Sequence, residues 1–318
     1  MLAAPALPTE SWAAPPETAN SIAMRGTVAS CTNQASIPPG ETRCWILAAA
    51  RPNSGACGVM AVDDRPWCGP GHPVAAYVYA EDRKAMRPAA HLAGFRGVLQ
   101  VDGYSGFKRL AGDRGDDSVR LAFCWAHMRR PFYQFFESTK SPLAAHVLAR
   151  IRELYVIEAE IRGHPAEHRQ AVRQARSRPI VEALQAWLQE QLPRVSGASD
   201  LAKAMRYALH HWPGLVAFLD DGRIEMDTNV VERVIRPITI TRKNALFAGN
   251  DGGARHWAIA MTLIQSAKLN GVEPMAWLPD VLQRVVSERT KASELDELLP
   301  WNWRPAPVGS GADYAAAA

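Results

Sequence analysis

The sequence lacks the run of about 20 apolar residues that a membrane-spanning helix needs, although apolar residues make up 47% of its 318. Its start, MLAAPALPTESWAAPPETA, has neither a basic segment nor a continuous apolar one, so we expect no signal peptide. These absences predict a cytoplasmic protein with no membrane partner. The length suffices for one large domain or two ordinary ones.

The chain also lacks a Cys-x-x-Cys pair. It has five cysteines, whereas a zinc ribbon needs closely paired thiolates and a secreted disulfide framework usually has an even count. We therefore expect reduced cysteines and no zinc site. Cys124 and His127 have a Cys-x-x-His spacing, which is half of a zinc site. The favoured interpretation is structural: a buried thiol beside a core or DNA-facing histidine.

A strong net charge is absent as well. The formal charge is +4 and the pI is near 8.9, which permits a nucleic-acid partner without requiring one. The positions of the basic residues are therefore more informative than their sum.

Residues 1–58 lack a periodic pattern of apolar residues, whether of period 2.0 or 3.6. They are rich in Ala, Pro, Ser and Thr and contain three of the five cysteines. We expect this segment to be disordered or loosely packed.

Folded structure is expected from Val59 onward. Apolar segments at 59–62, 74–80, 97–101 and 121–125 have the length and composition of strands. Strands separated by helical or loop pieces predict a sheet-bearing α/β domain, whose first part covers 59–140.

The period becomes helical from residue 141. Ser141 and Pro142 are typical of a helix start, and Gly163 is typical of a helix end. Three more helices follow within an all-helical block, 141–220: 165–176, 179–192 and 199–212, with Pro179, Pro193 and Pro213 as breaks. Two further helices, 253–270 and 274–287, belong to the segment 221–290, and the end of the tail 291–318 should be disordered.

Two acidic residues stand in places suited to chemistry. Asp102 follows the buried strand GVLQV, beside Gly103, and Glu232 lies near the start of a short helix. Arg236, Arg242 and Lys243 come soon after Glu232. Paired carboxylates bind divalent cations and nearby cations neutralise phosphate, so the pattern indicates a metal site for nucleic-acid chemistry.

Each of these residues also has an ordinary interpretation. Asp102 and Gly103 form a common turn pair. Asn229 and Glu232 match a capping box, and Glu232 stands four residues before Arg236, a stabilising helix pair.

Other basic residues could form a surface that contacts the DNA backbone. Arg129 and Arg130 follow His127, and a set at helical spacing comprises Arg162, Arg169, Arg173 and Arg176. Such residues can neutralise phosphates, but a solvated charged face is at least as good an explanation of the second set.

Several segments, taken in order, resemble one family. LQVDGYSGFKRL, FCWAHMRRPF, the stretch from DDGRIEMDTNVVERVIRP to LFAGNDGGARHWAIA, and the ending LPWNWRP are similar to the insertion-sequence-66 transposases, the large subunit of a bacterial mobile element. The resemblance covers about 60–305.

This resemblance implies an RNase-H-like catalytic domain with an Asp-Asp-Glu triad, interrupted by a helical insertion and followed by C-terminal helices. Asp102 matches the second Asp and Glu232 the Glu, with Asn229 as a supporting residue. Mg²⁺ or Mn²⁺ would be the cofactor. DNA, namely element ends and target, would be the partner, together with other transposition proteins and further copies of the chain.

The sequence departs from the family at its start. No counterpart of the first catalytic Asp is found in 1–58, and Asp63 and Asp64 are poor substitutes. We expect a truncated or frameshifted start and a sheet incomplete at its N-terminus, in which Glu41 becomes a candidate ligand only if the segment 44–50 replaces the missing strand. The alternative function is an inactive remnant that at most binds DNA or transposition partners.

Overall fold

The structure, a computed structural model, describes residues 43–50, 56–80, 92, 95–102, 119–241 and 250–305, with the backbone alone at 43–50, 56, 57, 241 and 292. Three residues considered above, Glu41, Arg242 and Lys243, lie outside this part of the chain, as does most of the segment 1–58.

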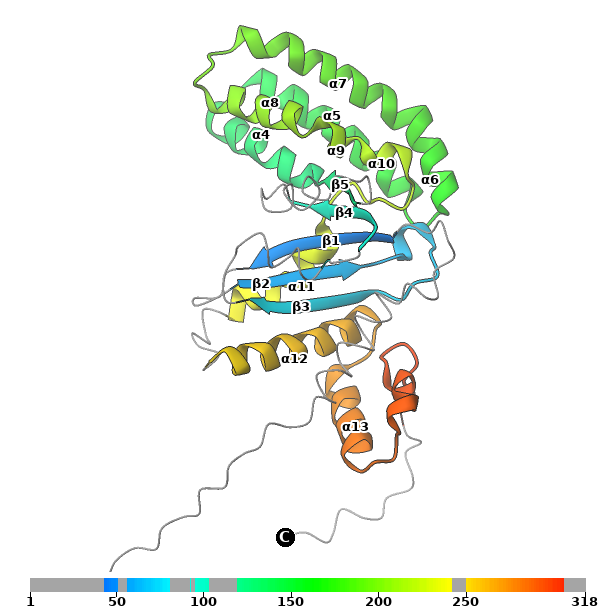
Figure 1. Ribbon diagram of the computed structural model, residues 1–318. Coiled ribbons are helices and arrows are strands. Elements are labelled where there is room, and N and C mark those ends of the chain that lie inside the picture. The colour runs from blue at the N-terminus through cyan, green and yellow to red at the C-terminus, as the bar shows by residue number, and fades with distance from the viewer. Residues whose placement is uncertain are drawn as a thin grey trace, which may run out of the picture.

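A mixed five-stranded sheet lies at the centre of the described structure (Figure 1). Its strands are β1 (Arg43–Ala50), β2 (Ala56–Val62), β3 (Val74–Ala80), β4 (Gly97–Val101) and β5 (Val119–Phe123). The order is β3-β2-β1-β4-β5. β1, β4 and β5 are parallel, and β2 runs antiparallel to both of its neighbours. The α/β class is confirmed, and the strand predicted at 121–125 begins and ends two residues earlier.

The predicted gap beside β4 does not exist in this sheet. β1 lies between β2 and β4, with Leu47 opposite Met60 on one side and Val101 on the other. Hydrogen bonding on both sides satisfies the backbone groups of β1. Residues 43–50 are therefore a paired strand and not part of a disordered or loosely packed segment, as we expected for 1–58. The prediction of a sheet incomplete at its N-terminus is therefore wrong for the described strands.

Both faces of the sheet are buried, with side chains alternating between them as the pleat requires. On one face, Val59 and Tyr77 pack against Val231 and Val234 of helix α11 (Asn229–Thr241). The other face forms a separate cluster of Met60, Val62, Val74, Ala76, Val78, Leu92, Leu99, Val101 and Val119. The sheet thus holds α11, the helix of Glu232, through apolar burial.

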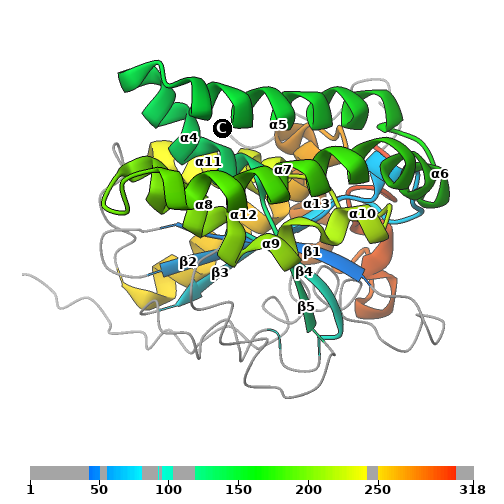
Figure 2. The same ribbon diagram turned by 90° about the horizontal axis from the view of Figure 1, so that it is seen from above.

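A helical block, Trp125 to Asp220, lies beyond the β5 edge of the sheet (Figures 1 and 2). Its α-helices are α4 (Trp125–Thr139), α5 (Pro142–Ile161), α6 (Ala166–Val172), α7 (Arg178–Gln191), α8 (Asp200–His210), α9 (Trp212–Leu215) and α10 (Ala217–Asp220). The block begins earlier than residue 141, because α4 follows β5 directly and buries Trp125 and Phe132.

The predicted bounds of α5 are confirmed. Pro142 opens the helix and Gly163, at φ +81°, follows its end. The predicted break at Pro179 is wrong: α6 continues through a π-helical turn, Arg173–Ser177, into α7. Pro179 stands in the first turn of α7, where its missing N–H costs no hydrogen bond.

Helix α12 (Asp251–Leu269) lies at the opposite edge, beside β3, and α13 (Pro274–Val286) lies beyond α12 (Figure 1). Hydroxyl groups of α12 accept hydrogen bonds from backbone N–H groups of the edge strand β3. Tyr77 N donates to Thr262 Oγ1 at 2.9 Å, and Ala75 N donates to Ser266 Oγ at 3.3 Å. The buried Trp277 of α13 donates to the Leu298 carbonyl. No helix in the described ranges is long and apolar enough to cross a membrane.

Candidate active site

Asp102 is held at the end of β4 by the strand and by its neighbour Gln100. Every residue of β4 is buried, and Gln100 Nε2 donates to the backbone oxygen of Glu225 at 2.7 Å. This bond ties the strand of Asp102 to the segment that leads into α11. Asp102 itself is half-buried, so its carboxylate stands on a fixed support at the edge of the core.

Glu232 lies one turn into α11. The buried residues of this helix face the sheet, and Glu232 projects toward α4 instead, where its Oε1 lies 3.6 Å from His127 Nε2. Its side chain is 42% exposed, so a ligand could reach the carboxylate. Just before the helix, Asp227 Oδ1 accepts from the Asn229 N–H at 2.9 Å.

Asp102 and Glu232 both act on His127. The pKa of His127 is raised above its usual value, first by the interaction with Cys124; burial opposes this, and the charges of Glu232 and Asp102 reinforce it. The charges of two acidic groups 130 positions apart in the sequence thus influence one histidine. Asp102 also helps to raise the pKa of Tyr207 in α8, after burial, the main cause.

Cys124 is the buried centre of this region. It is 3% exposed, and its Sγ accepts hydrogen bonds from the backbone N and the Oγ1 of Thr228, both at 3.3 Å. Burial alone would raise the pKa of the thiol, but the interactions with His127 and Thr228 outweigh it, and the pKa is lowered. The predicted structural role of Cys124 and His127 agrees with this placement.

The predicted DNA-facing residues differ in their surroundings. Arg236 on α11 and Arg130 on α4 are exposed. Arg129 is half-buried, with its guanidinium 4.9 Å from the centre of the Tyr133 ring.

The arginine set of the helical block is only partly exposed: the side chains of Arg162 and Arg176 are 54% and 49% exposed, and the other two members are buried. Arg169 and Arg173 are 1% and 0% exposed. Both bind Glu158, and Arg169 also binds Glu225 at 2.5 Å. Arg162 binds Glu225 at 2.8 Å as well. The guanidinium groups of Arg162 and Arg169 join the helical block to the segment before α11. Burial makes Arg169 and Arg173 unavailable to phosphates.

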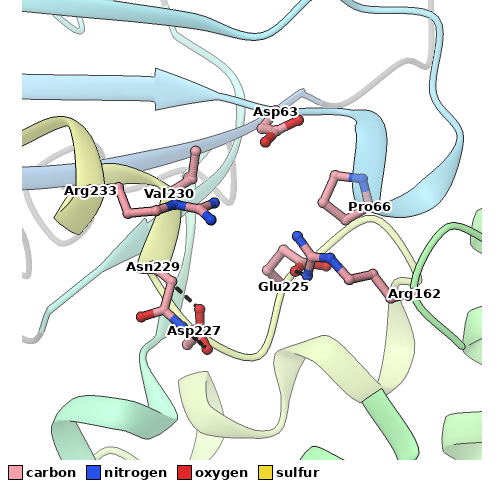
Figure 3. Close-up of a pocket in the computed structure, with 8 residues that line it drawn as sticks. All are labelled: Asp63, Pro66, Arg162, Glu225, Asp227, Asn229, Val230 and Arg233. Atoms are coloured by element: carbon pink, nitrogen blue, oxygen red, sulfur yellow. Dashed lines mark hydrogen bonds and ion pairs between the residues drawn. The ribbon is translucent and has the colours of Figure 1, made fainter. Parts of the chain in front are cut away.

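A cavity of about 180 Å³ lies at the start of α11 (Figure 3). It is lined by Asp63, Pro66, Arg162, Glu225, Asp227, Asn229, Val230 and Arg233. Burial, the largest influence, raises the pKa of Asp227. Sequence analysis missed Glu225, and the only signal for it is its position shortly before Glu232.

The carboxylates suit a divalent cation only in part. Asp102 and Glu232 offer the hard oxygen donors that Mg²⁺ prefers, and Mg²⁺ is often held by one or two carboxylates with water and phosphate. β1, which lies beside β4, reads RCWILAAA and contains no acidic residue. In the portion that the structure describes, no group of three His, Cys, Asp or Glu side chains could hold a metal.

Comparison with known proteins assigns the chain. Residues 41–256 match the model of the Transposase IS66 family, and 262–301 match the IS66 C-terminal element. The likeness therefore begins well before residue 60, where we expected it to start. No solved structure matches.

Three uncharacterized proteins of Sinorhizobium fredii (strain NBRC 101917 / NGR234) are similar: y4jD at 48% identity, y4qI at 44% and y4hP at 36%. The alignments cover 86%, 87% and 85% of this chain but only 54%, 51% and 51% of those proteins. The chain thus spans about half the length of these relatives. Since the family model covers more than half of it, the chain belongs to the Transposase IS66 family.

Proposed function

We propose that this chain is the catalytic region of a transposase, which cleaves DNA at the ends of a mobile element and joins it to a target by phosphoryl transfer. The observation that carries the proposal is that Glu232, from a helix, lies 3.6 Å from His127, whose pKa is also raised by the charge of Asp102, from a strand end. The mixed sheet, with the Glu helix packed on one face, supports an RNase-H-like fold.

Asp102 and Glu232 would hold the divalent cation, Mg²⁺ or Mn²⁺. When bound, such an ion neutralises charge on the reacting phosphate and lowers the pKa of a bound hydroxyl or water. The rigid supports of the two carboxylates keep them oriented without substrate, which is the preorganisation such a site needs.

DNA would approach over α4 and α11. Arg130 and Arg236 are exposed there, and Arg129, Arg242 and Lys243 belong to the same two segments of the chain. Cations of this kind bind phosphates without reading sequence. Other transposition proteins and a second copy of the chain are the further partners that we propose.

Strand transfer on element-end DNA in Mg²⁺ tests the proposal. We expect Asp102→Asn and Glu232→Gln to abolish product, because each removes a charge that holds the cation. Asp200→Asn is the matched control, since Asp200 is an exposed acid on α8 that pairs with Lys203. Equal product from Asp102→Asn and from the unmodified chain would refute the site.

A second candidate function is a non-catalytic remnant that binds DNA or partner subunits. It is favoured by one observation, the absence of an acidic residue from β1 beside Asp102. It predicts DNA binding that weakens with salt and with Arg236→Ala, but no strand transfer in Mg²⁺ or Mn²⁺. Product that depends on Asp102 would exclude it.

A further inference from the structure

The junction between β5 and α4 is hydrogen-bonded to the segment that leads into α11. Trp125 N donates to the Met226 carbonyl at 3.1 Å. Thr228 donates twice to Cys124 Sγ, and the Thr228 carbonyl accepts from Glu232 N at 3.1 Å, the first turn of α11. Thr228, which is hydrogen-bonded to Cys124, therefore fixes the start of α11.

Water is excluded from this contact. Thr228 and Trp125 are 0% exposed, and Cys124 is 3% exposed. Sulfur is a weak acceptor, yet both donors of Thr228 point to it. A buried donor that loses its acceptor costs more than an ordinary hydrogen bond contributes, so the sulfur is the group that keeps Thr228 in place.

The spacings on the two helices match. On α4, His127 stands three residues after Cys124, one helical turn along. On α11, Glu232 stands four residues after Thr228, also one turn along. Residues at these spacings lie on one helix face. The pair Cys124–Thr228 is consequently followed, one turn on, by the pair His127–Glu232, whose atoms lie 3.6 Å apart.

We propose that Cys124 and His127 are positioning residues for Glu232: the thiol fixes the start of α11 through Thr228, and the imidazole holds the Glu232 carboxylate. The site so arranged would take a divalent cation that prefers oxygen ligands. The inference rests on the proposed function for the cation, but the two contacts can be tested without it.

Amide exchange in the full chain without metal tests the thiol contact. Cys124→Ala removes the acceptor, and we expect exchange at Thr228 N–H to accelerate about fivefold or more. Cys124→Ser restores an acceptor and should recover part of the protection. Cys68→Ala, at an exposed cysteine, is the control. Equal protection of Thr228 in the Cys124→Ala variant and the unmodified chain would overturn the thiol's role.

Mn²⁺ binding by the full chain, followed by electron paramagnetic resonance, tests the imidazole contact. His127→Ala should weaken Mn²⁺ affinity about tenfold or more, as loss of a group that orients a ligand does. His127→Gln, which keeps a donor, should retain most of the affinity, and His256→Ala, at an exposed position of α12, should retain all of it. Unchanged affinity in His127→Ala, or equal loss in the Ala and Gln variants, would refute the positioning role of His127.

A failure of the proposed metal site and a failure of the positioning role of His127 give different results. If Asp102→Asn and Glu232→Gln leave Mn²⁺ affinity unchanged, the proposed metal site is wrong, and the positioning of Glu232 for a cation fails with it. If those two variants lose Mn²⁺ while His127→Ala retains it, the metal site stands and only the role of His127 falls.

Discussion

Arg169 and Glu225 form a buried ion pair, Nη2 to Oε1 at 2.5 Å, between residues 56 positions apart. Arg169 belongs to α6 in the helical block, and Glu225 lies seven residues before Glu232. Through its backbone oxygen Glu225 also accepts from Gln100 of β4. One residue therefore connects the helical block, the strand of Asp102 and the approach to the Glu helix.

Removing Arg169 should be costly because it leaves Glu225 without its buried partner and leaves Glu158 with Arg173 alone. We expect Arg169→Met to lower the free energy of unfolding by about 3–5 kcal/mol, the cost of breaking a buried ion pair. Urea denaturation measures the change. Arg176→Met is the control, since Arg176 pairs with Glu160 at an exposed site, and exposed pairs contribute little. Similar losses in both variants would contradict the buried role.

Lowering the pH should weaken the interactions of the Asp221 carboxylate with Arg223 and Arg120. Burial raises its pKa, but hydrogen bonds from Arg223 and the charge of Arg120 outweigh burial, and the pKa is lowered. The carboxylate of a group with a depressed folded pKa stabilises the fold fully above its unfolded pKa of about 4. That stability is lost as the pH falls through the folded pKa.

The difference in unfolding free energy between the unmodified chain and Asp221→Asn should therefore be largest near pH 7 and shrink on acidification below about pH 4. Urea denaturation across this range measures it, with Glu190→Gln, an exposed acid paired with Arg194, for comparison. A difference independent of pH would show that Asp221 acts through shape and not through charge.

Gly222 lies where no side chain fits. A Cβ built on it would be 1.8 Å from the backbone oxygen of Ala166, so the helical block and the segment before α11 would have to separate. We expect Gly222→Ala to destabilise the fold by about 1–3 kcal/mol or more, as overpacking does. At Gly197 a Cβ meets nothing within 4 Å, and Gly197→Ala should change the melting temperature little.

The hydroxyl of Thr262 in α12 should stabilise the edge strand β3 by accepting a backbone hydrogen bond. Thr262→Val removes the acceptor of the buried Tyr77 N–H, and we expect a loss of about 1–3 kcal/mol together with faster amide exchange at Tyr77. Thr239→Val serves as the control because its hydroxyl is exposed and bonds only the Arg236 carbonyl one turn back. Unchanged exchange at Tyr77 would mean that the hydroxyl does not protect the edge.

Local patterns in the sequence determined the elements and the residues that mark the family. Pro142 and Gly163 bound α5 because their backbone preferences act within one turn. The apolar segments of β2, β3 and β4 have strand composition whatever they pair with. Asp102 and Glu232 stood out because each occupies a typical position, a strand end and a helix start.

Only the tertiary structure decided which of these groups meet. β1 joins the sheet through partners, Met60 and Val101, that are distant in sequence, and nothing in RCWILAAA specifies them. Arg169 and Arg173 have the spacing of a solvated helix face, yet their carboxylate partners lie 11 to 56 positions away and bury them. The position of Glu232 beside His127 likewise depends on long-range packing, because spacing along a chain fixes which residues share a helix face but not which other helix that face contacts.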